Sequence, residues 1–335
     1  MKPTIAFVTG GYSGESVISY KSAVNILKNV DADKFDVYKI DITLQGWYYV
    51  ATNGDRSAVD RQDFSIIDNG RKINFDAVLI GIHGSPGEDG KLQGYFDLMN
   101  LPYTSCDAAT SALTFNKRYT VAIASFSGIN VAKSVVLIRG KFGNPDEVAK
   151  QLRFPVFVKP NNGGSSIGMS KVNNATEELV TAIEKAFKED EQVLIEEFVM
   201  GREFTIGVFR SAGKIITLPF TEIKTKKEFF DFEAKYTPGF TDEVTPAQVD
   251  EAIAEKVRDT AKKVYQVFNC NGVIRIDFIY NEEKGEPFLL EINTVPGQTD
   301  ESIVPQQVRA MGWTLKQFYS ALIEEAMGRK YNLKM

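Results

Sequence analysis

Two short segments near the C-terminal end constrain the fold of this chain more than any other part of it. Residues 273–280 (VIRIDFIY) and 288–293 (FLLEIN) largely alternate between apolar and polar side chains. This pattern is typical of β-strands, because successive side chains on a strand point to opposite faces. A polar segment, 281–287 (NEEKGEP), connects them. The two segments are therefore predicted to pair as a hairpin with one apolar face and one polar face.

The polar face of this hairpin gathers charged groups in one particular register. If Asp277 lies across from Glu291, then Arg275 lies across from Asn293. The apolar face then carries Ile274, Ile276, Phe278, Tyr280, Phe288, Leu290 and Ile292. Carboxylate and amide oxygens on a rigid sheet are suitable ligands for Mg²⁺ that also holds a polyphosphate. A sheet with one solvated face is the alternative, and the hairpin by itself favours that simpler interpretation.

The composition bounds the class of protein. A chain of 335 residues can form two or three domains with cores of their own. The net charge of −5 is opposite in sign to the footprint of nucleic-acid-binding proteins, so no nucleic-acid partner is expected. No segment approaches the run of about 20 apolar residues that spans a bilayer, so no membrane partner is expected. The first residues run into glycines and are interpreted as a strand rather than a signal peptide.

Both cysteines are expected to be small buried hydrophobic residues. Cys106 and Cys270 lie far apart in the sequence and lack the spacing of metal ligands. This usage is typical of a reducing compartment, so the expected location is cytoplasmic.

Strand–helix alternation characterises the first hundred residues. Residues 4–9 are predicted to form a strand, which ends in a glycine-containing turn. An amphipathic helix follows, and its apolar stripe consists of Val17, Tyr20, Val24 and Leu27. Residues 75–82 (FDAVLIGI) are almost continuously apolar, as expected for a strand covered on both faces. The pattern predicts a small doubly wound α/β domain that extends to about residue 104.

A second unit of strands and helices follows. Its predicted helices span residues 115–126, 145–152 and 175–187, and its strands include 134–138, 156–159 and 192–198. A long polar stretch, 222–245, exceeds a simple connection and is interpreted as a lid. Its aromatic residues argue against a disordered insertion. A helix over 246–268 precedes the hairpin, and helices over 302–311 and 314–327 complete the chain.

Residues 159–168 (KPNNGGSSIG) have the composition of an anion-binding loop. Glycine allows backbone N–H groups to approach an anion closely, and consecutive N–H groups form a concave binding site. Lys159 ends an otherwise apolar strand, where an unpaired charge would be costly, so phosphate binding is favoured. A flexible hairpin tip is the alternative.

Residues 196–203 (EEFVMGRE) place carboxylates at both ends of a short apolar crossover. Backbone groups of such a segment can bind the edge of a purine, and a nearby carboxylate can accept hydrogen bonds from an amine or from ribose hydroxyls. On chemistry alone, a solvated charge cluster is the simpler interpretation.

Three further polar residues follow predicted strand or helix boundaries. His83, the only histidine, begins HGSPGEDG after a buried strand, where ligand-binding loops occur. Without a partner nucleophile it is interpreted as a structural hydrogen-bonding residue rather than a triad base. Lys117 could bind phosphate or be an ordinary surface lysine. Glu15 could favour a helix dipole or bind a substrate ammonium group.

Taken in order, these segments resemble the D-alanine–D-alanine ligases of the ATP-grasp superfamily. The matching motifs extend over nearly the whole chain: GGYSGE (10–15), HGSPGEDG (83–90), NK (116–117), VKPNNGGSSIGMSKV (158–172), EEFVMGREFT (196–205), FEAKYTPG (232–239), RIDF (275–278) and LLEINTVPGQT (289–299). Their order and spacing together are specific to this family.

The resemblance implies an α/β protein with a Rossmann-like preATP-grasp domain over 1–104. A two-part ATP-grasp domain would follow, with a central subdomain over 105–198 and a C-terminal subdomain over 199–335 that carries the lid. It also implies a homodimer. The implied reaction joins two D-alanine molecules through a D-alanyl phosphate, with release of ADP and phosphate, for peptidoglycan precursor synthesis.

The resemblance also assigns nucleotide and metal ligands. ATP phosphates would be held by Lys117, Lys159, Ser166 and Lys235. Adenine would lie at Glu196 and the backbone near Glu197 and Val199, and the ribose at Glu203. Two Mg²⁺ or Mn²⁺ ions would be bound by Asp277, Glu291 and Asn293.

The implied amino-acid site completes the assignment. Glu15 would bind the ammonium group of the first D-alanine, and His83 would lie close to the second. Arg275 and the Gly297 N–H would stabilise the oxyanion, while Ser302 and the Ile303 backbone would bind the second carboxylate. Glu15, Ser165 and Tyr236 would form a hydrogen-bonded set that ties the lid to the substrate. A tyrosine at 236 favours a dipeptide rather than a depsipeptide product.

Two other functions remain open from the sequence. A related ATP-grasp enzyme could join a different carboxylate to a different amine or hydroxy acid. A catalytically silent nucleotide-binding module would lack a metal or phosphate ligand, whereas Asp277, Glu291, Asn293, Lys117 and Lys159 are all present.

Overall fold

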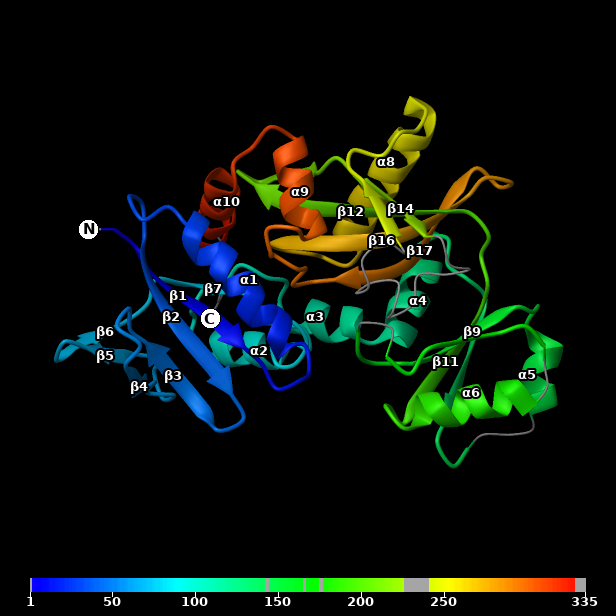
Figure 1. Ribbon diagram of the computed structural model, residues 1–335, viewed down its shortest axis with the longest axis horizontal. Helices are drawn as coiled ribbons and strands as arrows, with labels where there is room; N and C mark the ends of the chain where they lie inside the picture. Colours follow the sequence, from blue (N-terminus) through cyan, green and yellow to red (C-terminus); the bar gives the residue numbers. More distant parts are fainter. Residues whose placement is uncertain (1, 142–144, 165–166, 175–176, 226–240, 329–335) are drawn as a thin grey trace, which may run out of the picture.

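The computed structural model describes residues 2–141, 145–164, 167–174, 177–225 and 241–328. Within these ranges the strands form three larger sheets and one two-stranded sheet. The N-terminal sheet lies at one end of the molecule, the central sheet lies at the other, and the C-terminal sheet spans the region between them (Figure 1).

The N-terminal sheet has helices on both faces. Its strands, in spatial order, are β4 (Arg56–Ala58), β3 (Gly46–Val50), β2 (Asp36–Thr43), β1 (Thr4–Gly10) and β7 (Ala77–Ile80). The two-stranded sheet is a separate hairpin of β5 (Ile66–Asp68) and β6 (Arg71–Ile73). β1 pairs in parallel with β2 and β7. Phe7 shares a core with α1 (Ser16–Asn29), and Val8 shares another with α2 (Lys91–Leu98). The predicted doubly wound arrangement is confirmed, and β7 is buried on both faces as expected.

Helix α1 lies with its apolar stripe outward, whereas the apolar stripe of an amphipathic helix ordinarily faces the core. Val17 is 57% exposed and Val24 is 72% exposed, while Tyr20 and Leu27 are each 39% exposed. The buried side instead consists of Ser19, Ser22, Ala23, Asn25 and Ile26. The polar members of this set contact loop backbone, as described below, so hydrogen bonding determines which side is buried.

The central sheet is antiparallel throughout. Its spatial order is β10 (Ser170–Val172), β9 (Val156–Pro160), β11 (Gln192–Glu197) and β8 (Ser134–Ile138), with α5 (Pro145–Gln151) and α6 (Glu177–Phe187) beside it. Its core, which includes Val158, Ile183 and Val193, is separate from the others. The predicted helix over 115–126 is α4 (Lys117–Phe126), and a helix that was not predicted, α3 (Ala108–Phe115), precedes it. They separate at Asn116, whose side chain caps α4 by accepting the Tyr119 N–H.

The C-terminal sheet contains the hairpin predicted from the sequence. Its strands are β15 (Thr241–Val244), β14 (Thr221–Thr225), β12 (Arg202–Ser211), β16 (Val273–Asn281) and β17 (Glu286–Asn293), with β13 (Lys214–Thr217) paired to β12. Asp277 pairs with Glu291 and Arg275 with Asn293, so the predicted register is confirmed. A bulge then pairs Phe278 with Leu289, and Leu290 lines a cleft instead of sharing the buried face.

Three helices accompany this sheet, namely α8 (Glu251–Val267), α9 (Ile303–Ala310) and α10 (Leu315–Gly328). The predicted helix from residue 246 begins only after Asp250. β14 and β15 pair with each other at the two ends of the predicted lid, and most of the lid lies outside the described residues.

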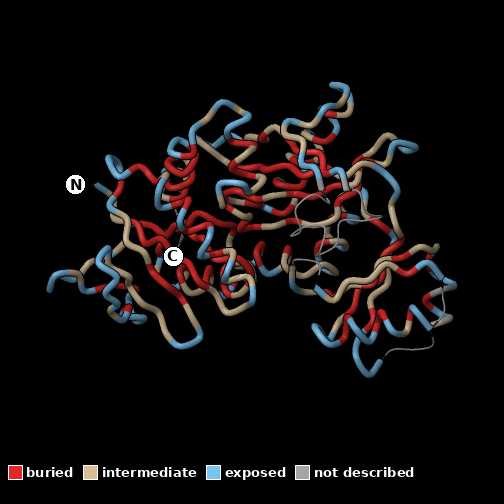
Figure 2. The backbone as a smooth tube through the Cα atoms, in the orientation of Figure 1, coloured by how far each residue is buried: buried red, intermediate tan, exposed pale blue. Residues whose placement is uncertain are grey.

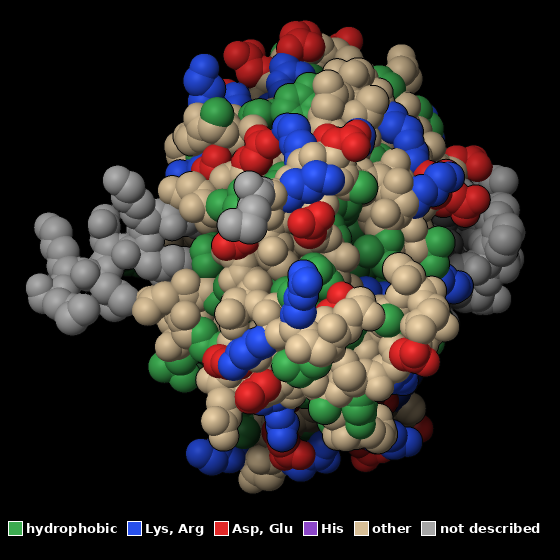
Figure 3. Space-filling model, turned by 90° about the vertical axis from the view of Figure 1, so that its left-hand side faces the viewer, with side chains coloured by type: hydrophobic (Ala, Val, Ile, Leu, Met, Phe, Trp, Pro, Cys, Tyr) green, Lys and Arg blue, Asp and Glu red, His purple; other side chains and the backbone are tan. Residues whose placement is uncertain are grey.

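One continuous core joins the N-terminal and C-terminal sheets. Phe7 of β1, Phe209 of β12 and Phe318 of α10 belong to it, and buried backbone runs across this part of the molecule (Figure 2). Cys106 and Cys270 are free and buried, as predicted. On the face drawn in Figure 3, acidic and basic side chains are intermingled.

Candidate active site

A cleft of about 1180 Å³ lies where the three larger sheets meet. Every predicted site residue within the described ranges lines it: Glu15, His83, Lys117, Lys159, Glu196, Glu197, Val199, Glu203, Arg275, Asp277, Glu291, Asn293, Gly297, Ser302 and Ile303. Ser165, Ser166, Lys235 and Tyr236 lie outside the described residues. Segments from all parts of the chain therefore converge on a single cleft.

The polar face of the β16–β17 hairpin forms one wall of this cleft. Arg275 donates two hydrogen bonds to Asp277, at 2.9 and 2.8 Å, and its guanidinium lies 3.8 Å from Glu291. Asn293 donates to Asp277 at 3.4 Å, and the Thr205 hydroxyl also donates to Asp277. Burial alone would lower the pKa of Arg275, but Asp277 raises it above its usual range. The guanidinium is therefore a permanent positive charge in the cleft.

Thr205 is a contact that the sequence analysis missed. It faces Asp277 across the β12–β16 pairing. The threonine stands in the matched segment EEFVMGREFT. Only the pairing of β12 with β16 shows its significance, and sequence spacing does not reveal that pairing.

The donor set on this wall fits a hard divalent cation. Asp277 and Glu291 supply carboxylate oxygens and Asn293 an amide oxygen, all from one sheet face. Within the described residues, no group of three or more His, Cys, Asp or Glu side chains is placed to hold a metal by itself. The wall alone is thus an incomplete coordination sphere, which suits Mg²⁺ because that ion usually retains waters and binds substrate phosphates.

The opposite wall carries the two candidate phosphate lysines. Lys117 begins α4, where its N–H donates to Asn161 O at 3.0 Å and its ammonium group donates to Gly163 O at 2.6 Å. Lys159 forms an ion pair with Glu196, and the two side chains are 13% and 9% exposed. The counter-charge of this largely buried lysine is thus a residue that the resemblance assigned to adenine.

Glu197 has a structural partner on the far side of β11. Its carboxylate accepts from the Arg153 backbone N–H at 3.0 Å and from the Arg153 guanidinium at 3.2 and 3.0 Å. Burial alone would raise the pKa of Glu197, but the bonds to Arg153 lower it overall. Since the Glu197 side chain is bound to Arg153, a purine would contact the backbone of this residue, as the resemblance implied.

Glu15 lies between the N-terminal domain and the glycine-rich loop. A Cβ atom added at Gly84 would come within 2.5 Å of one Glu15 carboxylate oxygen, and one added at Gly164 within 2.7 Å of the other. The absence of a Cβ atom at both positions permits this close approach. The carboxylate therefore lies against the glycine-rich loop at Gly164.

His83 is a neutral, fully engaged imidazole. Its Nδ1–H donates to Val295 O at 2.7 Å, and the Ser22 hydroxyl lies 2.9 Å from Nε2, which must act as the acceptor. Burial lowers the pKa of His83 to about 4. Both ring nitrogens are occupied, so the structure supports the interpretation of His83 as a structural hydrogen-bonding residue.

Glu88, in the same loop, is a second residue that the sequence analysis missed. One carboxylate oxygen accepts the Gly84 N–H at 2.8 Å and the other accepts the Val295 N–H at 3.0 Å. Burial raises the pKa of Glu88 to about 8, and the nearby charge of Glu15 adds to the effect. Its position in HGSPGEDG, directly after a buried strand, was the available signal.

The far end of the cleft is formed by residues 294–303. Ser302 precedes α9 without a side-chain capping bond, so the first N–H groups of that helix remain available to an anion. The Ser302 hydroxyl lies 2.7 Å from the Thr299 hydroxyl and accepts the Thr299 N–H at 3.0 Å. A Cβ atom at Gly297 would lie 2.9 Å from the Ser302 hydroxyl, so glycine permits the close approach of this turn to Ser302. The arrangement suits a carboxylate.

Comparison with known proteins identifies the family to which this architecture belongs. A family model described as D-ala D-ala ligase N-terminus matches residues 4–106, and one described as D-ala D-ala ligase C-terminus matches residues 123–324. A D-alanine–D-alanine ligase from Phocaeicola vulgatus is 44% identical over 325 residues, which cover 97% of this chain and 99% of the relative.

Solved structures agree with the sequence comparison. The VanG D-Ala:D-Ser ligase from Enterococcus faecalis superimposes with a TM-score of 0.86 at 32% identity, covering 97% of this chain and 100% of the other. The D-alanyl-alanine synthetase A from Vibrio cholerae also gives 0.86, at 27% identity, with 98% and 99% covered.

This chain belongs to the D-alanine–D-alanine ligase family and has the ATP-grasp fold. The enzymes of this family synthesise D-alanyl-D-alanine with ATP, for peptidoglycan. Both the resemblance and the predicted fold class are therefore confirmed.

Proposed function

We propose that this protein joins two D-alanine molecules through a D-alanyl phosphate and releases ADP and phosphate. The main support is the cleft itself. It brings the carboxylates of the β16–β17 hairpin, two lysines near the glycine-rich loop and Glu15 to one place. No side-chain nucleophile is needed, because phosphorylation turns a carboxylate into an electrophile that an amine can attack. Phosphoryl transfer requires mainly positioning and neutralisation of charge.

Nucleotide binding is assigned to the walls of the cleft. Lys117, Lys159, Ser166 and Lys235 would hold the phosphates, Glu196 and the backbone near Glu197 and Val199 would hold adenine, and Glu203 would hold the ribose. Asp277, Glu291 and Asn293 would bind two Mg²⁺ or Mn²⁺ ions. When bound, these ions supply positive charge that neutralises the triphosphate.

The amino acids would occupy the opposite end. Glu15 would bind the ammonium group of the first D-alanine, with Ser165 and Tyr236 in the same hydrogen-bonded set, and His83 would lie near the second. Arg275 and the Gly297 N–H would stabilise the tetrahedral oxyanion that forms when the second amine attacks. The second carboxylate would lie at Ser302 and the N–H of Ile303, at the start of α9.

The second substrate is the finer question, because one structural neighbour is named a D-Ala:D-Ser ligase. We propose D-alanine, with Tyr236 disfavouring a hydroxy acid. The test is to incubate the protein with ATP, Mg²⁺ and equal D-alanine, D-serine and D-lactate, and to identify products by mass spectrometry. D-Alanyl-D-alanine should dominate. A mixture dominated by another product would reassign the second site, and no ATP-dependent product would refute the function.

We also propose the domain boundaries of 1–104, 105–198 and 199–335, with a lid over about 222–245. The lid would exclude water from the acyl phosphate through Lys235 and Tyr236. The first and last sheets share a core whereas the central sheet has its own, which supports a separate central subdomain.

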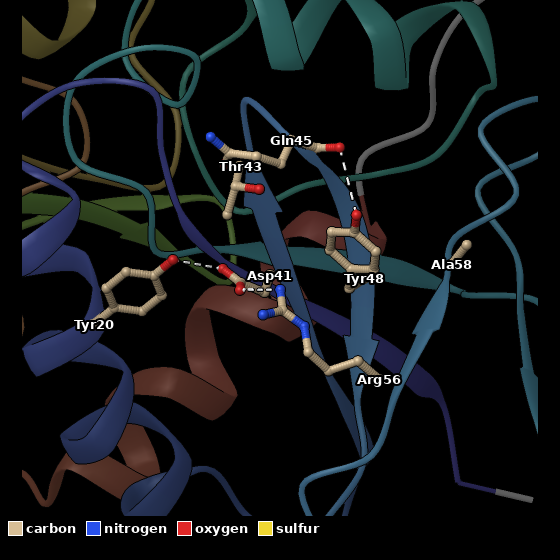
Figure 4. A pocket seen from close by; sticks show the side chains of 7 residues that line it. All are labelled: Tyr20, Asp41, Thr43, Gln45, Tyr48, Arg56 and Ala58. Atoms are coloured by element: carbon tan, nitrogen blue, oxygen red, sulfur yellow. Dashed lines mark hydrogen bonds and ion pairs between the residues drawn. The ribbon is translucent and has the colours of Figure 1, made fainter.

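We propose that the protein is a cytoplasmic homodimer. No helix in the described ranges is both long enough and apolar enough to traverse a bilayer. The exposed stripe of α1, Val17, Tyr20, Val24 and Leu27, is the candidate self-contact, since a two-fold interface needs one self-complementary patch. Tyr20 is held in place by Asp41, at 2.8 Å, which also pairs with Arg56 at 2.6 Å (Figure 4). Sedimentation of the wild type should give twice the mass of one chain.

A further inference from the structure

The backbone N–H and C=O groups of Val295 are both hydrogen-bonded to a single loop of the N-terminal domain. His83 Nδ1–H donates to the Val295 carbonyl at 2.7 Å, and Glu88 accepts the Val295 N–H at 3.0 Å. Val295 follows the metal-binding strand β17 and precedes Gly297 by two residues. The loop after β7 thus fixes the chain at the point where it leaves the sheet and enters the amino-acid end of the cleft.

A second hold lies on the other side of Gly297. The Ser22 hydroxyl accepts the Gln298 N–H at 3.1 Å, and Asn25 donates to the Gln298 carbonyl at 2.8 Å. Both residues belong to the buried polar side of α1. Since Ser22 also contacts His83, at 2.9 Å, the contacts at Gln298 are linked to those at Val295. Gly297 therefore lies between Val295 and Gln298, and the backbone N–H and C=O groups of both residues are hydrogen-bonded to the N-terminal domain.

We propose that Glu88 is a positioning residue for the second amino-acid site. By holding the Val295 peptide it sets the position of the Gly297 N–H and of the segment that leads to Ser302. This inference rests on the proposed function of the same cleft. Its physical basis is that the two oxygens of one carboxyl group accept N–H groups from separate segments, Gly84 and Val295. A glutamine would direct an NH₂ group at one of these donors, so one hold would be lost with little change in shape.

A purely structural role for Glu88 makes a different prediction. If it only stabilised the fold, its replacement would lower the melting temperature, and the folded enzyme would keep its kinetic constants. A positioning role requires a selective effect. The second-site KM should rise and kcat should fall, while the first-site constant and ADP affinity should not change, because Lys159 and Glu196, which are assigned to phosphate and adenine, lie on the central sheet.

The test compares Glu88→Gln with a matched control, Asp76→Asn. Asp76 also accepts a backbone N–H from another segment, Thr4 at 2.7 Å, but it is not among the residues that line the cleft. Initial rates with varied D-alanine would be resolved into first-site and second-site constants. For Glu88→Gln we expect the second-site KM to rise and kcat to fall by about tenfold each, the effect of one unsatisfied buried donor. The control should stay within about twofold of the wild type, as a substitution outside the site.

Two results would overturn the proposal. One is a second-site KM and kcat equal to those of the wild type, and the other is an equal loss of ADP affinity. If Glu88→Gln does not fold, Ser22→Ala decides in its place. It removes the hold on the Gln298 N–H, so the second-site KM should rise by about threefold, at the low end of the effect of a lost hydrogen bond. An unchanged value would contradict the proposal.

Amide hydrogen exchange separates this inference from the proposed function. In Glu88→Gln, residues 295–299 should exchange faster than in the wild type, and in Asp76→Asn they should not. If the wild type makes no D-alanyl-D-alanine yet this segment loosens selectively, the reaction is wrong and the positioning contact stands. Unchanged exchange in Glu88→Gln would refute the positioning contact whatever the reaction.

Discussion

The β16–β17 hairpin and helix α1 distribute polarity in opposite ways. In the hairpin, Ile274, Ile276 and Phe278 are completely buried, and Asp277 and Glu291 line the cleft. In α1, Val17 and Val24 are exposed, and Ser19 and Ser22 are completely buried. Both elements contribute to the same active site, so the difference does not arise from distance to the chemistry.

The difference follows from what each element touches. The hairpin packs against α8, whose apolar residues include Val257, Ala261 and Val264. Helix α1 packs part of its surface against the backbone of two loops, whose N–H and C=O groups need partners when buried. An element that supports a loop must therefore bury polar side chains, and its apolar residues are left for another surface.

The largest effect is expected on the polar face of the hairpin. Asp277→Asn removes a carboxylate from the proposed metal site and weakens the hold on Arg275, so kcat should fall by about a thousandfold. The measurement is ADP release with saturating ATP and D-alanine. Glu286→Gln is the control, since Glu286 lies on β17, the other strand of the same hairpin, pairs with Lys256 at 2.9 Å and is not among the residues that line the cleft. Equal activity of the two variants would break the first half of the comparison.

A pH effect of about 3 kcal/mol is expected from His83, which α1 contacts through Ser22. Because burial lowers the pKa of His83 from 6.5 to about 4, the unfolded chain binds more protons between these values. The contribution of His83 to the free energy of unfolding is complete above pH 6.5 and is lost as the pH falls toward 4.

Denaturant unfolding of wild type and His83→Gln across this range measures that contribution. The stability of the wild type should fall more steeply with acid, and the two curves should converge toward pH 4. Parallel curves would show that His83 titrates normally in the folded state.

An intermediate effect is expected on the buried side of α1. Asn25→Leu replaces a buried amide with an apolar side chain and leaves the Gln298 carbonyl without its donor. The free energy of unfolding should fall by about 1–3 kcal/mol, the cost of an unsatisfied buried group. A more stable Asn25→Leu protein would mean that this side of α1 behaves as an ordinary apolar core.

The smallest effect on folding is expected on the exposed side of the same helix. Val24→Ser should change the free energy of unfolding of one chain by less than about 0.5 kcal/mol, as at other surface positions. In the proposed dimer it should weaken association, which sedimentation at decreasing protein concentration measures. An unchanged dimer would place the self-contact elsewhere.

The sequence was sufficient where side-chain alternation encodes a single pairing. Alternation in 273–280 and 288–293 predicted that Asp277 and Glu291 share the polar face, because a slip by one residue would expose the apolar face. The register that pairs them was a hypothesis, which the structure confirms. It could not reveal the bulge at Leu290 or the contact of Thr205, since both depend on how neighbouring strands pair.

Helix α1 and Glu88 escaped prediction for a related reason. The rule that an apolar stripe faces inward assumes an apolar neighbour, and here the neighbour is loop backbone. Glu88 acts through a peptide that lies 207 residues further along the chain, and no local pattern indicates such a partner. Residues whose own motif indicates a role could be predicted. Residues that act through backbone groups far away in the sequence could not.

The most direct test of the central claim is a crystal structure with ADP and Mn²⁺, with the manganese located by its anomalous scattering. The metals should lie between the nucleotide phosphates and the side chains of Asp277, Glu291 and Asn293. Manganese bound to the phosphates but on the far side of the cleft from this hairpin would contradict the account.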